Sequence, residues 1–169
     1  IEAYPNWGLD GFKYWEMAQI YHNPAIDIAS LRLKMCKDLF GNAYLQMKGY
    51  FDNLEKISYW LNNNTGTPTH MYNYAQQLTL DSARMVLVSD CRSYLNAASN
   101  LAVTSDEKQR VQFFNVGFTM IEGFWDAHNL GKSNIDLKSF INDNILGTDR
   151  YLFSGTDSSY INILYSLIK

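Results

Sequence analysis

Glu122, Asp126 and His128 form the most concentrated group of side chains that could do chemistry in this sequence. Glu122 and Asp126 are four residues apart, so a helix would bring both carboxylates to one face, with the His128 imidazole close behind. Such a group could act as a carboxylate pair beside a proton carrier. The same spacing also describes a solvated helix face opposite an aromatic stripe, and we favour that interpretation.

Metal and nucleophile chemistry have little support from the remaining residues. His22, His70 and His128 lie far apart, with none of the close spacing that converging metal ligands need. The sequence has no glycine-rich phosphate loop and no Gly-x-Ser-x-Gly turn. Cys36 and Cys91 are too few for a disulfide framework and are expected to be unpaired core thiols. We therefore expect no metal, no cofactor and no catalytic residue in this chain.

The composition describes one globular domain. The chain has 169 residues, 47% of them hydrophobic and 15% aromatic, which is enough for a substantial core. Charged residues make up only 18%, so a disordered chain is excluded. A net charge of -3 with no cluster of Lys and Arg argues against a nucleic-acid partner. The most apolar stretch, residues 111–125, is interrupted by Gln112, Asn115 and Glu122 and is too short to span a membrane.

Hydrophobic periodicity predicts an all-α fold, an irregular bundle of about five to seven helices with a single core. The expected helices cover residues 11–22, 28–40, 43–61, 79–101, 105–129, 133–144 and 158–168. Asp27 and Thr79 are expected to cap the second and fourth helices. Thr104 and Glu107 form a capping box before the fifth helix, and Gly131 is expected to end it.

The second expected helix carries an apolar stripe at helical spacing. Ile28, Leu31, Met35 and Leu39 make up this stripe, which we expect to be its buried face.

The aromatic residues fall into two groups. Those on apolar helix faces are expected to be core: Phe12, Trp15, Phe40, Phe51, Phe114, Phe118 and Trp125. Tyr4, Trp7, Tyr72 and Tyr74 fall in segments expected to be irregular. Aromatic side chains in such segments can stack on the apolar faces of sugar rings or can close the end of a bundle. We favour the second role for all of them except Trp7.

An ordered set of short motifs in the first third of the chain resembles a known family. The set comprises residues 2–11 (EAYPNWGLDG), Tyr14-Trp15, Ala18-Gln19, Asn23-Pro24, Ile26-Asp27, residues 39–43 (LFGNA), Met47-Lys48 and Tyr50-Phe51, and Arg110-Val111 after the capping box also fits. The set resembles the C-terminal helical region of the bacterial glycoside-hydrolase-like family of unknown function 4838, which is distantly similar to α-glucuronidases. Asn42 stands where that family usually has Pro.

The resemblance implies a piece of a larger protein. Glycosidases of this kind carry their two catalytic carboxylates on a (β/α)8 barrel of about 250 residues, which this chain does not contain. Residues 1–10 are then expected to be a remnant of the barrel, with the rest of residues 1–169 forming a single helical domain. Glu2, Asn6 and Trp7 are the expected substrate-binding residues at its sugar site. The implied partners are the barrel domain of the parent protein and an oligosaccharide, in a secreted, periplasmic or cell-surface setting.

Two interpretations of function follow. In the first, the chain is a non-catalytic helical domain of a carbohydrate-processing bacterial protein, with an apolar patch where the barrel packs. In the second, it is an independent helical module that binds another protein, has no catalytic role and has a polar surface throughout.

Overall fold

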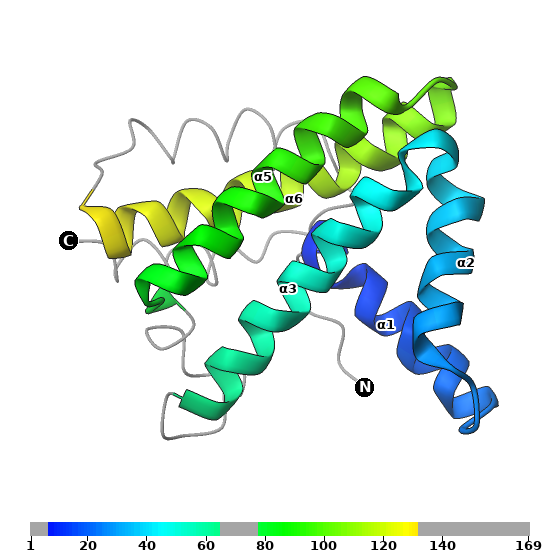
Figure 1. Ribbon diagram of the computed structural model, residues 1–169, viewed down its shortest axis with the longest axis horizontal. Helices are drawn as coiled ribbons and strands as arrows, with labels where there is room; N and C mark the ends of the chain where they lie inside the picture. The colour runs from blue at the N-terminus through cyan, green and yellow to red at the C-terminus, as the bar shows by residue number, and fades with distance from the viewer. Residues whose placement is uncertain (1–6, 65–77, 132–169) are drawn as a thin grey trace, which may run out of the picture.

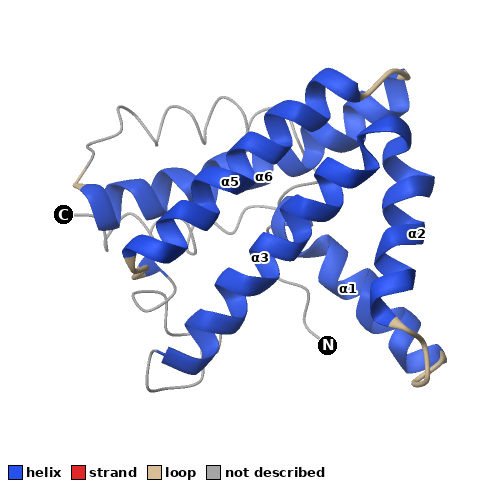
Figure 2. Cartoon of the chain, in the orientation of Figure 1, coloured by secondary structure: helices blue, strands red, loops and turns tan. Residues whose placement is uncertain are grey.

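The computed structural model describes residues 7–64 and 78–131, and within these ranges every regular element is helical (Figure 2). The elements are α1 (Trp7–His22), α2 (Ile28–Phe40), the short 3-10 helix η1 (Gly41–Ala43), α3 (Tyr44–Asn64), α5 (Ser82–Leu101) and α6 (Ser105–Leu130). The predicted all-α fold is confirmed. The helices expected at 133–144 and 158–168 lie outside the described residues.

The long helices α3, α5 and α6 form the body of the bundle. In Figure 1, α5 lies between α3 and α6, and α1 and α2 stand at the right of the view. The most extensive contact joins α3 to α5, while α1 packs against α6 and α2 packs against α3. The first helix, α1, is therefore held in place by α6, which follows it by about a hundred residues in the sequence.

The first helix begins earlier than predicted. We expected residues 1–10 to be irregular, but α1 already starts at Trp7. Gly8 and Gly11 each weaken a helix by only about 1 kcal/mol, and Pro5 precedes the first turn, so neither type of residue prevents this start. The placement of Trp7 in an irregular segment is thus wrong, since it is the first residue of a helix.

The second helix has the predicted ends but a different buried face. Its buried residues are Arg32, Met35, Cys36 and Phe40. Of the predicted stripe, only Met35 is fully buried, and Ile28 is 43% exposed. The buried face is therefore rotated from the most apolar one, because Arg32 is drawn inward by the carboxylates described below.

Aromatic rings from α1, α2, α3 and α6 meet at the centre of the core. The ring of Phe12 stacks on Phe51 with centroids 3.9 Å apart. Phe51 in turn meets Phe114 edge to face at 5.0 Å, and Tyr50 meets Phe118 at 5.5 Å. Such edge-to-face contacts add to the free energy of burial. Of the seven aromatics predicted as core, all are buried except Trp15, which is partly buried against the cluster.

Local capping signals define three helix ends. Asp27 accepts a hydrogen bond from the Ser30 backbone N–H at 3.1 Å, as predicted. The capping box of Thr104 and Glu107 is present, and Gly131 ends α6 in the left-handed conformation. The predicted cap at Thr79 is wrong, because Asp81 caps α5. Asp81 stands two residues closer to the apolar residues of α5 and accepts the hydrogen bond from the Arg84 backbone N–H.

Candidate functional site

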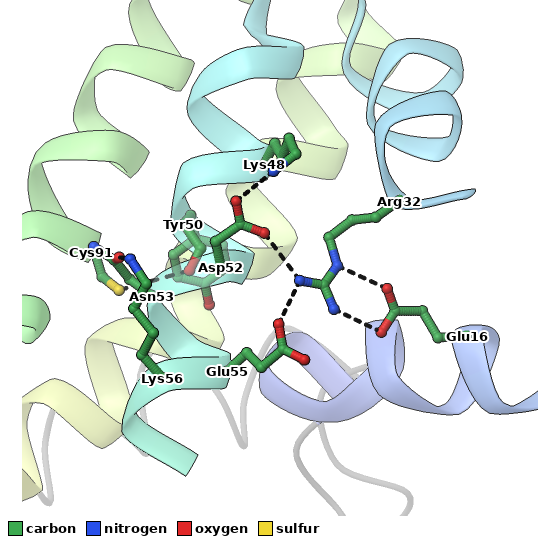
Figure 3. A network of polar contacts seen from close by, with 9 residues as sticks. All are labelled: Glu16, Arg32, Lys48, Tyr50, Asp52, Asn53, Glu55, Lys56 and Cys91. Carbon is green, nitrogen blue, oxygen red and sulfur yellow. Dashed lines mark hydrogen bonds and ion pairs between the residues drawn. The ribbon is translucent and has the colours of Figure 1, made fainter. Parts of the chain in front are cut away.

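A buried arginine is the centre of a polar network that joins three helices. Arg32 on α2 faces Glu16 on α1, and Asp52 and Glu55 on α3 (Figure 3). Its Nε and Nη2 donate to the two carboxylate oxygens of Glu16 at 2.8 and 3.1 Å. Its Nη1 donates to Asp52 at 2.9 Å and to Glu55 at 2.7 Å. One guanidinium thus joins three helices.

The charged groups at the centre of the network are largely shielded from solvent. The side chains of Arg32 and Glu16 are only 9% and 11% exposed, whereas that of Glu55 is 63% exposed. Burial by itself would lower the pKa of Arg32, but hydrogen bonds from Arg32 to Glu16, Glu55 and Asp52 raise it above its ordinary value. The guanidinium also lies over the Phe12 ring, 5.5 Å from its centroid. A planar group of this kind tolerates burial only when its donors are paired.

A lysine on α3 adds a second cation to the network. Lys48 donates to the second carboxylate oxygen of Asp52 at 2.5 Å, one helical turn away. Burial would raise the pKa of Asp52, but Lys48 and Arg32 outweigh it and hold the pKa below its ordinary value. Asp52 is therefore a carboxylate at neutral pH, fixed between two cations.

This arrangement favours a structural role over catalysis. The guanidinium uses four hydrogen bonds to bind carboxylates of this same chain, out of the five N–H groups that an arginine has. Asp52 is stabilised in its charged form, whereas a general acid at neutral pH needs a raised pKa. The network is suited to holding α1, α2 and α3 together.

A second arginine forms an ion pair with Glu122, one member of the Glu122, Asp126 and His128 group. Arg92 on α5 donates to Glu122 on α6, with its Nε 3.0 Å from Oε2. The same guanidinium binds the side-chain oxygens of Asn115 at 2.5 Å and Thr119 at 2.8 Å. Glu122 is half-buried in this contact, so the expectation of a fully solvated face is wrong for it.

His128 does not share the surroundings of Glu122. It is exposed, and its Nε2 lies 3.2 Å from the Thr79 hydroxyl. Glu122 instead bridges α5 and α6 through Arg92. The alternative of a carboxylate pair acting with a proton carrier thus gains no support from these contacts.

The two cysteines are unpaired and fully buried, as predicted. Burial raises the pKa of each thiol to about 12. The Cys91 thiol donates to the Tyr50 carbonyl oxygen at 3.7 Å. A nucleophilic cysteine needs a lowered pKa, so these thiols belong to the core.

Of the residues predicted to bind substrate, Trp7 alone belongs to the described part of the chain. Glu2 and Asn6 fall outside the described residues, as do Tyr4, Tyr72 and Tyr74. Trp7 is the first residue of α1. The prediction of a sugar-binding group made of Glu2, Asn6 and Trp7 therefore stays a prediction.

Within residues 7–64 and 78–131, no group of three or more His, Cys, Asp or Glu could hold a metal ion. None of the helices in that part of the chain has the length and hydropathy needed to cross a bilayer.

Every described α-helix carries at least one exposed large apolar side chain, and those on α3 and α5 lie on helices that pack together. On α3, Leu45 is 56% exposed and Tyr59 is 71% exposed. On α5, Val86 is 59% exposed and Tyr94 is 38% exposed, with the Tyr94 ring lying over Gly49 of α3. We call these four side chains the α3–α5 apolar group. Its members could contact another polypeptide.

The Arg32 network was not predicted from the sequence. One available signal was local: Lys48 and Asp52 stand four residues apart on one helix and form an ion pair. A second signal was a lone arginine directly beside the apolar positions of the second helix. Neither signal identified Glu16 as a partner of Arg32, because the two residues are sixteen positions apart and lie on different helices.

Comparison with known proteins identifies no relative. No family model matches the chain, and neither a curated protein nor a solved structure matches it.

Proposed function

We propose that this chain is a non-catalytic helical module that acts by packing against another folded domain. The observation that carries the non-catalytic part is the pairing of Arg32 with three carboxylates of its own chain. Arg92 is bound in a similar way to Glu122, Asn115 and Thr119. The strongest polar groups described are thus used to join helices.

The α3–α5 apolar group supports the packing part of the proposal. The first interpretation of the sequence requires apolar surface on the bundle, whereas the second requires a polar surface throughout. Exposed fractions of 56% at Leu45 and 71% at Tyr59 agree better with the first. In line with the sequence resemblance, we propose the barrel domain of a carbohydrate-processing bacterial protein, acting outside the cytoplasm, as the domain that packs there.

The catalytic claim is tested with the full 169-residue chain and a panel of 4-nitrophenyl glycosides that includes an α-glucuronide. We expect no release of nitrophenol above the protein-free blank. Release that is lost in Glu122→Gln but kept in the matched surface variant Asp38→Asn would overturn the proposal.

The packing claim is tested by co-expression with the polypeptide encoded directly upstream of Ile1. We expect the two to co-purify and expect the double variant Tyr59→Ser, Val86→Ser to weaken this association at least tenfold. Lys34→Ser is the control, because its side chain is 74% exposed on another helix. An upstream sequence without barrel-like βα units would contradict the proposal.

The sugar-binding residues are tested in the same complex. We expect Trp7→Ala to weaken oligosaccharide binding about tenfold or more in calorimetry, since loss of one aromatic–sugar stack removes about 1–2 kcal/mol. Unchanged binding in this variant would remove Trp7 from the site, and the packing claim would stand or fall separately.

A second candidate is an independent module that binds a different protein. The observation in its favour is a core to which every described α-helix contributes, from Phe12 on α1 to Trp125 on α6. Such a core is typical of a unit that folds without a second domain. A chain that is monomeric, cooperatively folded and unaffected by the upstream polypeptide would favour this candidate.

A further inference from the structure

We draw no further inference here: the strongest candidate, the exposed apolar side chains Leu45, Tyr59, Val86 and Tyr94 on α3 and α5, is already used for the proposed function, and nothing in the structure shows what covers them.

Discussion

The Glu107 carboxylate lies against the backbone of Gly41, so close that a Cβ on Gly41 would stand 2.1 Å from its Oε1. The same carboxylate accepts hydrogen bonds from the backbone N–H groups of Val103 and Thr104, at 2.8 and 3.2 Å. These bonds hold the pKa of Glu107 below its ordinary value. The side chain that closes the capping box of α6 therefore also occupies the space beside the end of α2.

Gly41→Ala is expected to destabilise the protein by about 2–4 kcal/mol, because two costs add. Gly41 has φ +49°, where a side chain is strained, and the new methyl group would displace Glu107 from its cap. Urea unfolding followed by circular dichroism measures the loss. Gly131→Ala is the control for a positive φ without a clash: its φ is +61° and no atom of the described residues lies within 4 Å of the added Cβ, so only about 1 kcal/mol is expected.

The variant Glu107→Ala separates the cost of backbone strain at Gly41 from the cost of the clash with the Glu107 side chain. If the clash contributes, Gly41→Ala should destabilise the Glu107→Ala background less than it destabilises the natural chain. Equal losses in the two backgrounds would mean that backbone strain at Gly41 is the entire cause.

Local signals explain which helix ends could be predicted. The ends of α2 and the capping box before α6 depend on residues within four positions of one another, so their spacing in the sequence determines them. The start of α1 was missed because Pro5 and Gly8 were given more weight than the helical residues around them. Helix-breaking residues near a terminus carry less weight than the same residues in a helix interior.

Contacts between distant helices explain what could not be predicted. The buried face of α2 depends on Glu16 and Asp52, which meet Arg32 only after α1 and α3 have packed. Glu122 was assigned to a solvated face because its partner, Arg92, lies thirty residues away on another helix. Periodicity identifies an apolar face but does not show which polar residue on its border is paired and buried.

Removing Arg32 is expected to be one of the most destabilising single changes in the described core. Arg32→Met keeps the length of the side chain but leaves Glu16 buried without its partner, at a cost of about 3–5 kcal/mol. Chemical denaturation at pH 7 measures the loss. Lys34→Met is the control: it removes an exposed pair with Asp38 and should change the free energy of unfolding by less than about 0.5 kcal/mol.

Adding Glu16→Gln to Arg32→Met tests the reason for that cost. Since the double variant no longer buries an unpaired carboxylate, we expect it to be more stable than Arg32→Met. A double variant at least as unstable as the sum of the two single changes would show that the lost free energy comes from packing on Phe12 and not from charge.

Asp52 should make stability depend on pH in the acid range. Its folded pKa lies below the ordinary value near 3.8, so the unfolded chain binds a proton first as the pH falls. The stabilisation is therefore complete above pH about 5 and is lost as the pH falls from about 4 through the folded pKa. Asp52→Asn should cost about 1–2 kcal/mol at pH 7 and progressively less below pH 4.

The measurement is a series of urea midpoints between pH 2.5 and 7 for the natural chain and for Asp52→Asn. Asp38→Asn is the matched control, because the Asp38 side chain is 59% exposed in a pair with Lys34. A difference between the natural chain and Asp52→Asn that stays constant down to pH 2.5 would rule out the carboxylate charge as its source.

Both thiols should be protected from reagents in the folded state. Cys36 and Cys91 are fully buried, and each has a pKa of about 12, so thiolate is scarce at pH 8. With Ellman's reagent we expect at least a hundredfold slower reaction in buffer than in 6 M guanidinium chloride, where both cysteines of the chain should react. Rapid reaction of one thiol in buffer would mean that its surroundings open readily.

The same two thiols should weaken the fold in alkali. Their folded pKa values are raised, so their stabilisation is complete below the unfolded pKa near 9 and is lost as the pH rises toward 12. Between pH 8.5 and 10.5, the natural chain should therefore lose more of its free energy of unfolding than the double variant Cys36→Ala, Cys91→Ala. Tyrosine ionisation acts equally on both proteins, so the difference isolates the thiols. Parallel pH profiles would show that the folded thiols ionise as readily as the unfolded ones, contrary to their burial.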